Sequence, residues 1–230
     1  MPPIVKACYA NLKKHAGKHP IVLLTDKNIR QYVCSSSLWD NEIFKMVEEK
    51  RVTLTQLADF ARLCLLYTYG GIWIDSTVWL NKDMDEITSG LKFVSGRRVG
   101  VDNSCVPEGK WTTYFTGCSK GNLLPKFIYA VLLSHAKKEG LFIDYFMIDY
   151  AFVTAYNNLP YVREMIEEIP PMPNRFFVLM SMLNDEFTSE KDFEKICKQA
   201  PLFKLSYKGE LKTKTDDGKP TFYAHLIGEV

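Results

Sequence analysis

The segment from residue 53 to residue 77 constrains the fold more than any other part of the chain. Residues 53–56 (Thr-Leu-Thr-Gln) have the Ser/Thr-x-x-Gln pattern of a capping box, and an amphipathic run follows as far as Tyr69. Gly70 and Gly71 permit a tight reversal of the backbone at this point. The apolar stretch Ile72–Ile74 comes next and ends at a carboxylate. The pattern predicts a helix, a glycine turn and a short strand.

Three charged side chains of this segment are placed to act together. Asp59 and Arg62 are three residues apart, so that they share one face of the predicted helix. Asp75 closes the predicted strand, and α/β sheets form their ligand crevice beyond the carboxyl ends of their strands. We therefore expect two carboxylates and a guanidinium to face one crevice, with Gly70 and Gly71 letting a ligand approach the backbone. This arrangement suits a phosphorylated, polyhydroxylated ligand with a divalent cation.

The rest of the chain alternates helical and apolar β-type segments, which predicts an α/β fold in a single domain over residues 1–230. The segment Ile21–Thr25 is rich in β-branched and apolar residues and is expected to be a buried parallel-type strand. The other elements that the sequence predicts are helices over 3–16, 38–50 and 123–138, a helix within 141–157 that begins near Asp144, and strands over 93–95, 99–101, 112–116, 202–205 and 221–227.

Composition excludes several classes of protein. The chain is 47% hydrophobic and carries a net charge of only +2, without the basic stripe of a nucleic-acid binder. Its six cysteines form no Cys-x-x-Cys pair, which argues against a zinc ribbon and against a disulfide-stapled scaffold. It shows no signal peptide and no apolar run long enough to span a membrane. We expect a cytoplasmic protein whose partner is a small molecule or a glycan.

The window from Ala58 to Thr77 resembles the signature of the capsular polysaccharide synthesis glycosyltransferases, which are related to glycosyltransferase family 32 and to the glucosylating clostridial toxins. The segments Asp144–Asp149 and Leu202–Lys208 also resemble parts of that group. The similarity extends from Pro3 to the C-terminus, and the central window is its most specific part.

The resemblance implies a GT-A fold, in which a Rossmann-type sheet flanked by helices binds a nucleotide sugar together with Mn²⁺ or Mg²⁺. It implies a UDP- or GDP-linked donor and a glycan or lipid-linked sugar acceptor, as in the synthesis of capsule or exopolysaccharide. Residues 1–120 would then form the nucleotide-sugar-binding part, and residues 121–230 the acceptor side and a C-terminal lid. We expect no transmembrane segment, and the resemblance is compatible with peripheral contact with the inner face of the membrane.

Several residues take roles through this resemblance. Asp59 and Arg62 match the side chains that hold the ribose and the sugar of the donor. Asp75 matches the first carboxylate of the Asp-x-Asp motif, which serves the metal and catalysis. The second carboxylate falls on Thr77, and a hydroxyl is a far poorer cation ligand than a carboxylate. His225, near the C-terminus, is a candidate to complete the metal site, since imidazole binds Mn²⁺.

The remaining candidates lie in the second half of the chain. Lys208 could neutralise the diphosphate of the donor. Asp144 and Asp149 are candidate catalytic carboxylates; they are five residues apart and therefore do not share one helical face. The relatives also have a first strand upstream of the position where Met1 stands. We therefore expect the sheet of this chain to lack that strand, or the chain to start late.

Two other functions remain open on the sequence. The chain could be a non-catalytic or degenerate nucleotide-sugar-binding paralogue, as the departure at Thr77 and the missing first strand suggest. It could also be a phosphatase of the haloacid dehalogenase type, because residues 75–78 (Asp-Ser-Thr-Val) mimic the Asp-x-Asp-x-Thr/Val motif of those enzymes. The second carboxylate of that motif is missing, however, and the motif follows a helix instead of opening the domain.

Purely structural roles compete with the functional ones. Asp75 could simply cap the end of its strand, and Arg62 could form a helical ion pair with Asp59 or Glu49. Gly70 or Gly71 could serve as an ordinary helix C-cap. The three-dimensional arrangement of these side chains has to distinguish between the two kinds of role.

Overall fold

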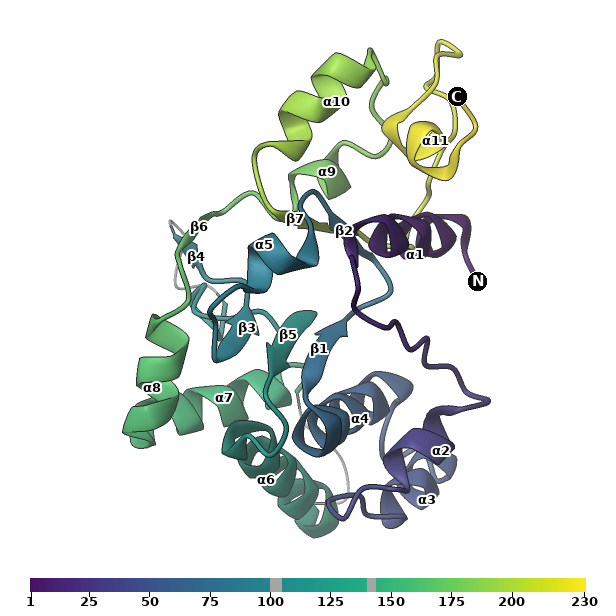
Figure 1. Cartoon of the computed structure of the whole chain (residues 1–230). Coiled ribbons are helices and arrows are strands. Elements are labelled where there is room, and N and C mark those ends of the chain that lie inside the picture. Colours follow the sequence, from purple (N-terminus) through teal and green to yellow (C-terminus); the bar gives the residue numbers. More distant parts are fainter. Residues whose placement is uncertain (100–104, 140–143) are drawn as a thin grey trace.

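The computed structural model describes residues 1–99, 105–139 and 144–230, and in these residues the fold is mixed α/β, as the sequence predicts (Figure 1). The elements, in chain order, are α1 (Pro3–His15), α2 (Ile29–Val33), α3 (Glu42–Glu48), α4 (Leu54–Tyr69), β1 (Gly71–Ile74), β2 (Val78–Leu80), α5 (Met84–Thr88), β3 (Phe93–Ser95), β4 (Arg98–Val99), β5 (Phe115–Cys118), α6 (Leu123–Glu139), α7 (Met147–Asn158), α8 (Pro160–Glu167), β6 (Met172–Pro173), α9 (Val178–Ser181), α10 (Glu190–Cys197), β7 (Leu202–Lys204) and α11 (Phe222–Ile227).

The strands of the described residues form three small sheets. The central sheet has the order β1-β5-β3, and β5 is antiparallel to both of its neighbours. β2 pairs with β7 in antiparallel orientation, which brings residues 78–80 beside residues 202–204. β4 and β6 form a short parallel pair. The β2–β7 pairing is important for function because it joins the end of the glycine-turn segment to a part of the chain more than a hundred residues away.

Two hydrophobic cores lie on opposite sides of the central sheet (Figure 1). The first, which we call the helical core, is built mainly from α4, α6 and α7 and includes Phe60, Leu63, Leu132, Phe152 and Ala155. The second, which we call the terminal core, unites both ends of the chain and includes Ile4, Cys8, Val78, Phe203 and Leu226. β1 runs between the two cores, so that the residues immediately after it lie where both cores meet.

The strand expected over Ile21–Thr25 does not form. No β-bridge of the described residues involves this segment, and the side chains of Val22 and Leu23 are exposed. The side chain of Asn28 bonds the local backbone instead: its Oδ1 accepts from the Thr25 amide at 2.7 Å, and its Nδ2 donates to the Leu23 carbonyl at 2.9 Å. The prediction was wrong because side-chain hydrogen bonds can replace a strand partner when no neighbouring strand is present.

The strand expected over residues 221–227 is also wrong, since these residues form helix α11. Thr221 acts as its N-cap, with Oγ1 accepting from the Ala224 amide at 3.1 Å. Gly228 ends the helix at φ +78°, a conformation that favours glycine. The apolar side chains of Phe222 and Leu226 are four residues apart and both enter the terminal core, so the segment has helical as well as strand-like periodicity.

The other boundaries shift by a few residues. The helix expected over 38–50 is limited to α3, and the strand expected over 112–116 appears as β5. The helix expected to begin near Asp144 starts at Met147, while residues 141–143 of that prediction lie outside the described residues. The strand predicted over 99–101 is described only at residue 99, within β4. The long helix expected over 123–138 is confirmed as α6.

Candidate functional site

Helix α4 places the first two charged residues of the site. Its capping box is formed in both directions: Thr53 Oγ1 accepts from the Gln56 amide at 3.3 Å, and Gln56 Oε1 accepts from the Thr53 amide at 2.8 Å. One turn further on, Arg62 Nη1 donates to Asp59 Oδ1 at 2.8 Å. Both side chains are buried, although they are charged. A buried ion pair of this kind needs further polar partners, since its desolvation is costly.

The turn after α4 favours glycine at both of its positions by backbone conformation, and at the first of them by close packing as well. Gly70 has φ +72°, and a Cβ atom on it would lie 2.6 Å from the amide nitrogen of Lys120. Gly71 has φ +91° but has open space around it. Both glycines line the cavity described below, in agreement with the expectation that a ligand could approach the backbone here.

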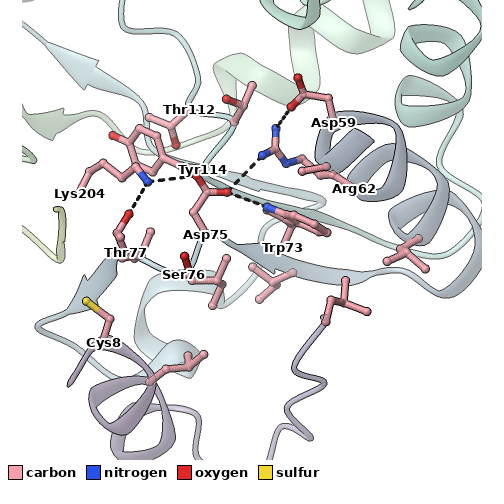
Figure 2. A pocket seen from close by; sticks show the side chains of 18 of the residues that line it. Cys8, Asp59, Arg62, Trp73, Asp75, Ser76, Thr77, Thr112, Tyr114 and Lys204 are labelled. Atoms are coloured by element: carbon pink, nitrogen blue, oxygen red, sulfur yellow. Dashed lines mark hydrogen bonds and ion pairs between the residues drawn. The ribbon is translucent and has the colours of Figure 1, made fainter. Parts of the chain in front are cut away.

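Asp75 is the centre of the hydrogen-bond network (Figure 2). Its Oδ1 accepts from Arg62 Nη2 at 3.2 Å and from Trp73 Nε1 at 2.9 Å. Its Oδ2 accepts from Lys204 Nζ at 3.1 Å. Asp75 therefore does more than cap a strand, because it bridges a cation from α4 and a cation from β7.

Lys204 reaches the site through the β2–β7 pairing. Val78 of β2 lies opposite Lys204 of β7, which brings the lysine side chain to the start of β2. Its ammonium donates to Thr77 Oγ1 at 2.7 Å as well as to Asp75 (Figure 2). Thr77 is itself buried, so this hydroxyl is a fixed part of the site.

The two carboxylates nearest Arg62 have opposite pKa shifts. Burial alone would raise the pKa of Asp75, but the charges of Arg62 and Lys204 outweigh it and hold the pKa below its ordinary value. Burial raises the pKa of Asp59 to about 6, against the opposing effect of Arg62, and the charges of Asp75 and Asp149 add to the rise. Asp75 is thus the more firmly ionised of the two.

Asp149 approaches the same site from α7. Its Oδ1 accepts from Trp111 Nε1 at 2.9 Å, and this indole is buried and stacked on Phe152 with ring centroids 5.3 Å apart. Burial raises the pKa of Asp149 to about 6, while the indole hydrogen bond and the charge of Arg62 lower it by less. A carboxylic acid with a pKa near neutrality can take up and release a proton during a reaction.

These groups line one large cavity of about 1630 Å³. Its wall includes all the charged residues of the network, namely Asp59, Arg62, Asp75, Asp149 and Lys204. Three exposed aromatic side chains, those of Tyr145, Phe146 and Tyr207, also line it. The cavity thus combines a charged floor with aromatic faces, a composition that fits a ligand with both phosphate and ring systems.

The structure brings most of the predicted site residues together on the cavity wall, and the two exceptions are Asp144 and His225. Lys208 lines the cavity from an exposed position. Asp144 does not line it; its Oδ1 accepts from the Phe146 amide at 2.7 Å and so stabilises the turn before α7. His225 also lies elsewhere, on α11, where its ring stacks on Phe187 with centroids 4.1 Å apart. Figure 1 shows α11 beside α1, away from α4 and β1.

Sequence reasoning missed four residues of the site. Lys204 is the most important; its only signal is a lysine in the otherwise apolar run of residues 202–205. Trp73 and Trp111 supply indole donors to carboxylates, which a tryptophan near a strand or in a loop does not reveal. Tyr114 lines the cavity with a buried hydroxyl that has no hydrogen-bond partner among the described residues, and Arg62 Nε is in the same situation. Both groups could serve a ligand.

The side chains around Asp75 do not fit a divalent cation. The described residues contain no group of three or more His, Cys, Asp or Glu side chains that could hold a metal ion. Both oxygens of Asp75 already accept from cationic groups, and His225 is not in the cavity. Hard divalent cations require several oxygen ligands, and a site occupied by a guanidinium and an ammonium offers few.

Comparison with known families assigns the chain to one of them. Residues 1–226 match the model of a family described as capsular polysaccharide synthesis protein, so the chain belongs to that family. Comparisons with curated proteins and with solved structures gave no significant match. Within the described residues, no helix has both the length and the apolar character needed to cross a lipid bilayer.

Proposed function

We propose that this protein is a glycosyltransferase of capsule or exopolysaccharide synthesis, which transfers a sugar from a UDP- or GDP-linked donor to a glycan or lipid-linked acceptor. Its membership of the capsular polysaccharide synthesis family supports the process. The observation that carries the proposal is the network of Asp59, Arg62, Asp75 and Lys204 on the wall of a cavity. We interpret the surrounding fold as a reduced GT-A arrangement.

The network suits the leaving group of sugar transfer. Breaking the bond between a sugar and a diphosphate leaves an additional negative charge on the diphosphate, and fixed cationic groups must stabilise it. Lys204 and Arg62 supply two such groups, and Asp75 holds both in place through its two oxygens. Because these groups are positioned before the ligand binds, they do not have to reorganise during the reaction.

The sugar and the nucleoside would occupy the remainder of the cavity. The buried carboxylate of Asp59 can accept hydrogen bonds from hydroxyl groups of a ribose or a hexose, as the family resemblance implies. The unpaired Nε of Arg62 and the hydroxyl of Tyr114 could bind the same ligand. A cavity of about 1630 Å³ exceeds the roughly 300–1,000 Å³ of ordinary small-molecule pockets, which leaves room for part of an acceptor.

Asp149 is the best candidate for a proton acceptor. The acceptor hydroxyl must lose its proton as it attacks the anomeric carbon, and a carboxylate with a pKa near neutrality is matched to that task. The pKa of Asp149, raised to about 6, meets this requirement at neutral pH. Tyr145 and Tyr207, which are exposed at the cavity, could stack on the sugar rings of the acceptor.

A panel of nucleotide sugars tests the proposal. Each UDP- and GDP-linked sugar would be screened for a rise in melting temperature, because a ligand that binds only the native state stabilises it. The best ligand would then be assayed for release of nucleoside diphosphate in the presence of candidate glycan acceptors. We expect Arg62→Ala to abolish the thermal shift, while Asp216→Asn, a change at a carboxylate with 96% side-chain exposure, should leave it unchanged.

The outcomes separate the alternative functions. Stabilisation together with turnover supports the glycosyltransferase. Stabilisation with no turnover on any acceptor would favour a nucleotide-sugar-binding paralogue. If no nucleotide sugar raises the melting temperature, the proposal is refuted, and hydrolysis of simple phosphate esters would then be the next activity to assay.

A further inference from the structure

The ammonium group of Lys204 lies between the two positions of the Asp-x-Asp-like motif. It donates to Asp75 Oδ2 at 3.1 Å and to Thr77 Oγ1 at 2.7 Å, so one atom bridges the first and third residues of the motif (Figure 2). The resemblance implies that related glycosyltransferases carry carboxylates at both of these positions, where they serve a divalent cation. In this chain a positive charge is therefore already built into that place.

The four side chains joined by ion pairs around Asp75 balance in charge without any added cation, whereas Asp149, the fifth charged residue of the network, accepts from an indole. Asp59 and Asp75 bring two negative charges, and Arg62 and Lys204 bring two positive charges. A divalent cation beside Asp75 would meet the like charges of both basic side chains and would have to displace Lys204 from Oδ2. Thr77 fits the same explanation, because a neutral hydroxyl accepts a hydrogen bond from the ammonium and adds no further negative charge.

The ammonium can still bind a ligand. A lysine ammonium has three hydrogen-bond donors, and two of them go to Asp75 and Thr77 in the described part of the chain. The Lys204 side chain retains 21% of its exposure and lines the cavity, so its third donor can reach a phosphate oxygen. Asp75 and Thr77 fix the position of the ammonium group, whereas an isolated surface lysine would not be held in one position.

We propose that Lys204 takes the place of the divalent cation and binds the diphosphate of the donor, so that this protein binds and uses its nucleotide sugar without a metal ion. This inference rests on the proposed function. In the reaction, the bond between the anomeric carbon and the diphosphate oxygen breaks, and its electron pair stays on that oxygen. The acceptor hydroxyl oxygen forms the new bond to the carbon, and its proton passes to Asp149. Lys204 and Arg62 neutralise the charge left on the diphosphate.

Calorimetric titration of UDP and GDP tests the inference, with EDTA in one series and Mn²⁺ in the other. We expect the wild-type protein to bind one of the two diphosphates with the same affinity in both series. Lys204→Ala should weaken this binding by about 10- to 100-fold, the loss typical of a hydrogen bond to a charged group. In the same variant, the affinity for the corresponding nucleoside monophosphate should fall by a smaller factor. Lys198→Ala, at an exposed lysine that ends α10, is the matched control.

Two further variants keep the inference testable if Lys204→Ala does not fold. Lys204→Arg keeps the positive charge and should retain binding in EDTA. The double variant Thr77→Asp with Lys204→Ala restores two carboxylates and removes the ammonium. We therefore expect its diphosphate affinity to rise about tenfold or more with Mn²⁺ and to fall again with EDTA.

The outcomes also separate this inference from the proposed function. Binding of a diphosphate by the wild type only when Mn²⁺ is present would overturn the role of Lys204 and leave the glycosyltransferase proposal intact. If Lys204→Ala bound the diphosphate in EDTA as tightly as the wild type does, the role of Lys204 would be overturned as well. If neither UDP nor GDP binds in either series, the proposed function itself fails.

Discussion

The two sides of the cavity hold their carboxylates in different ways. On the side where β1, β2 and β7 meet, Asp75 contacts two cations and an indole, and its pKa lies below the ordinary value. On the α7 side, Asp149 accepts a hydrogen bond from the indole of Trp111, and burial raises its pKa to about 6. One side therefore keeps a permanent charge, and the other can exchange a proton.

This difference indicates a division of work within one cavity. A carboxylate that orients two cations is suited to binding a diphosphate, because it keeps the cations in place without neutralising them fully. A buried carboxylate of raised pKa on the wall of the cavity is suited to proton transfer. Variants that change one side of the cavity at a time test whether the two sides have different roles.

Asp75→Asn should have the largest effect. The amide leaves Arg62 and Lys204 close together without their shared negative charge, and since Asp75 and Lys204 are only partly buried we expect a stability loss below the roughly 3–5 kcal/mol of a fully buried pair. We expect sugar transfer to fall by about 10³-fold, because both diphosphate-binding cations lose their positions. Circular dichroism should show a folded protein of lower stability. Full activity in this variant, with Asp216→Asn as the control, would contradict the assignment of Asp75.

The stability of the wild-type protein should depend on the protonation of Asp149. Because its pKa rises from 3.8 in the unfolded chain to about 6 in the folded protein, the folded state binds this proton more tightly. The associated stability is fully present below about pH 4, declines as the pH rises to about 6, and is absent above; the loss is about 3 kcal/mol at most. Asp59, also raised to about 6, should contribute in the same direction.

Urea denaturation at a series of pH values checks this dependence. Asp149→Asn should show a smaller fall in unfolding free energy between about pH 4 and about pH 6 than the wild type, since Asp59 then remains as one raised carboxylate in place of two. The amide oxygen can still accept from Trp111, so the variant should remain folded. An identical pH dependence in the two proteins would show that Asp149 is not raised in pKa.

The same variant should lower activity less than Asp75→Asn does. Loss of a general base typically costs about 10²- to 10⁴-fold, and the lower end is expected here because water can carry the proton from an open cavity. The affinity for nucleoside diphosphate should stay close to the wild-type value, because Lys204 and Arg62 are unchanged. An Asp149→Asn variant that loses diphosphate affinity as strongly as Asp75→Asn would remove the distinction between the two sides.

Trp73→Phe should have the smallest effect. The substitution removes the indole donor that lies 2.9 Å from Asp75 Oδ1 but leaves both cations in contact with the carboxylate. A hydrogen bond to a charged group contributes about 1.5–3 kcal/mol net, and the lower end, expected for this partly buried carboxylate, corresponds to a loss of about tenfold in activity. Steady-state kinetics would measure it, and a loss as large as that of Asp75→Asn would mean that the indole, rather than the cations, positions the carboxylate.

The half of the site that lies within α4, the glycine turn and β1 could be predicted from the sequence. Asp59, Arg62 and Asp75 fall within seventeen consecutive residues, and the capping box and Gly70 fix their local geometry. Helical spacing and a strand end are enough to bring such side chains together. The α/β class followed from the same alternation of elements.

The other half could not be predicted, because it depends on contacts between distant parts of the chain. Lys204 is 129 residues from Asp75 and reaches it only through the β2–β7 pairing, which no local pattern encodes. The sequence predicts Lys208 as the lysine that neutralises the diphosphate, and the structure places Lys208 on the cavity wall as well, in an exposed position. The strand expected over 21–25 failed for a related reason: apolar composition alone does not supply a partner strand.

The central claim is that α4, β1 and β7 together form the nucleotide-sugar site, and hydrogen exchange measures this most directly. The protein would be compared by mass spectrometry with and without the nucleotide sugar that stabilises it best. We predict slower exchange in residues 54–77 and in residues 202–208 together, with little change in residues 190–197 of α10. Binding that leaves both of the first two segments unchanged, or that protects α10 alone, would contradict the account.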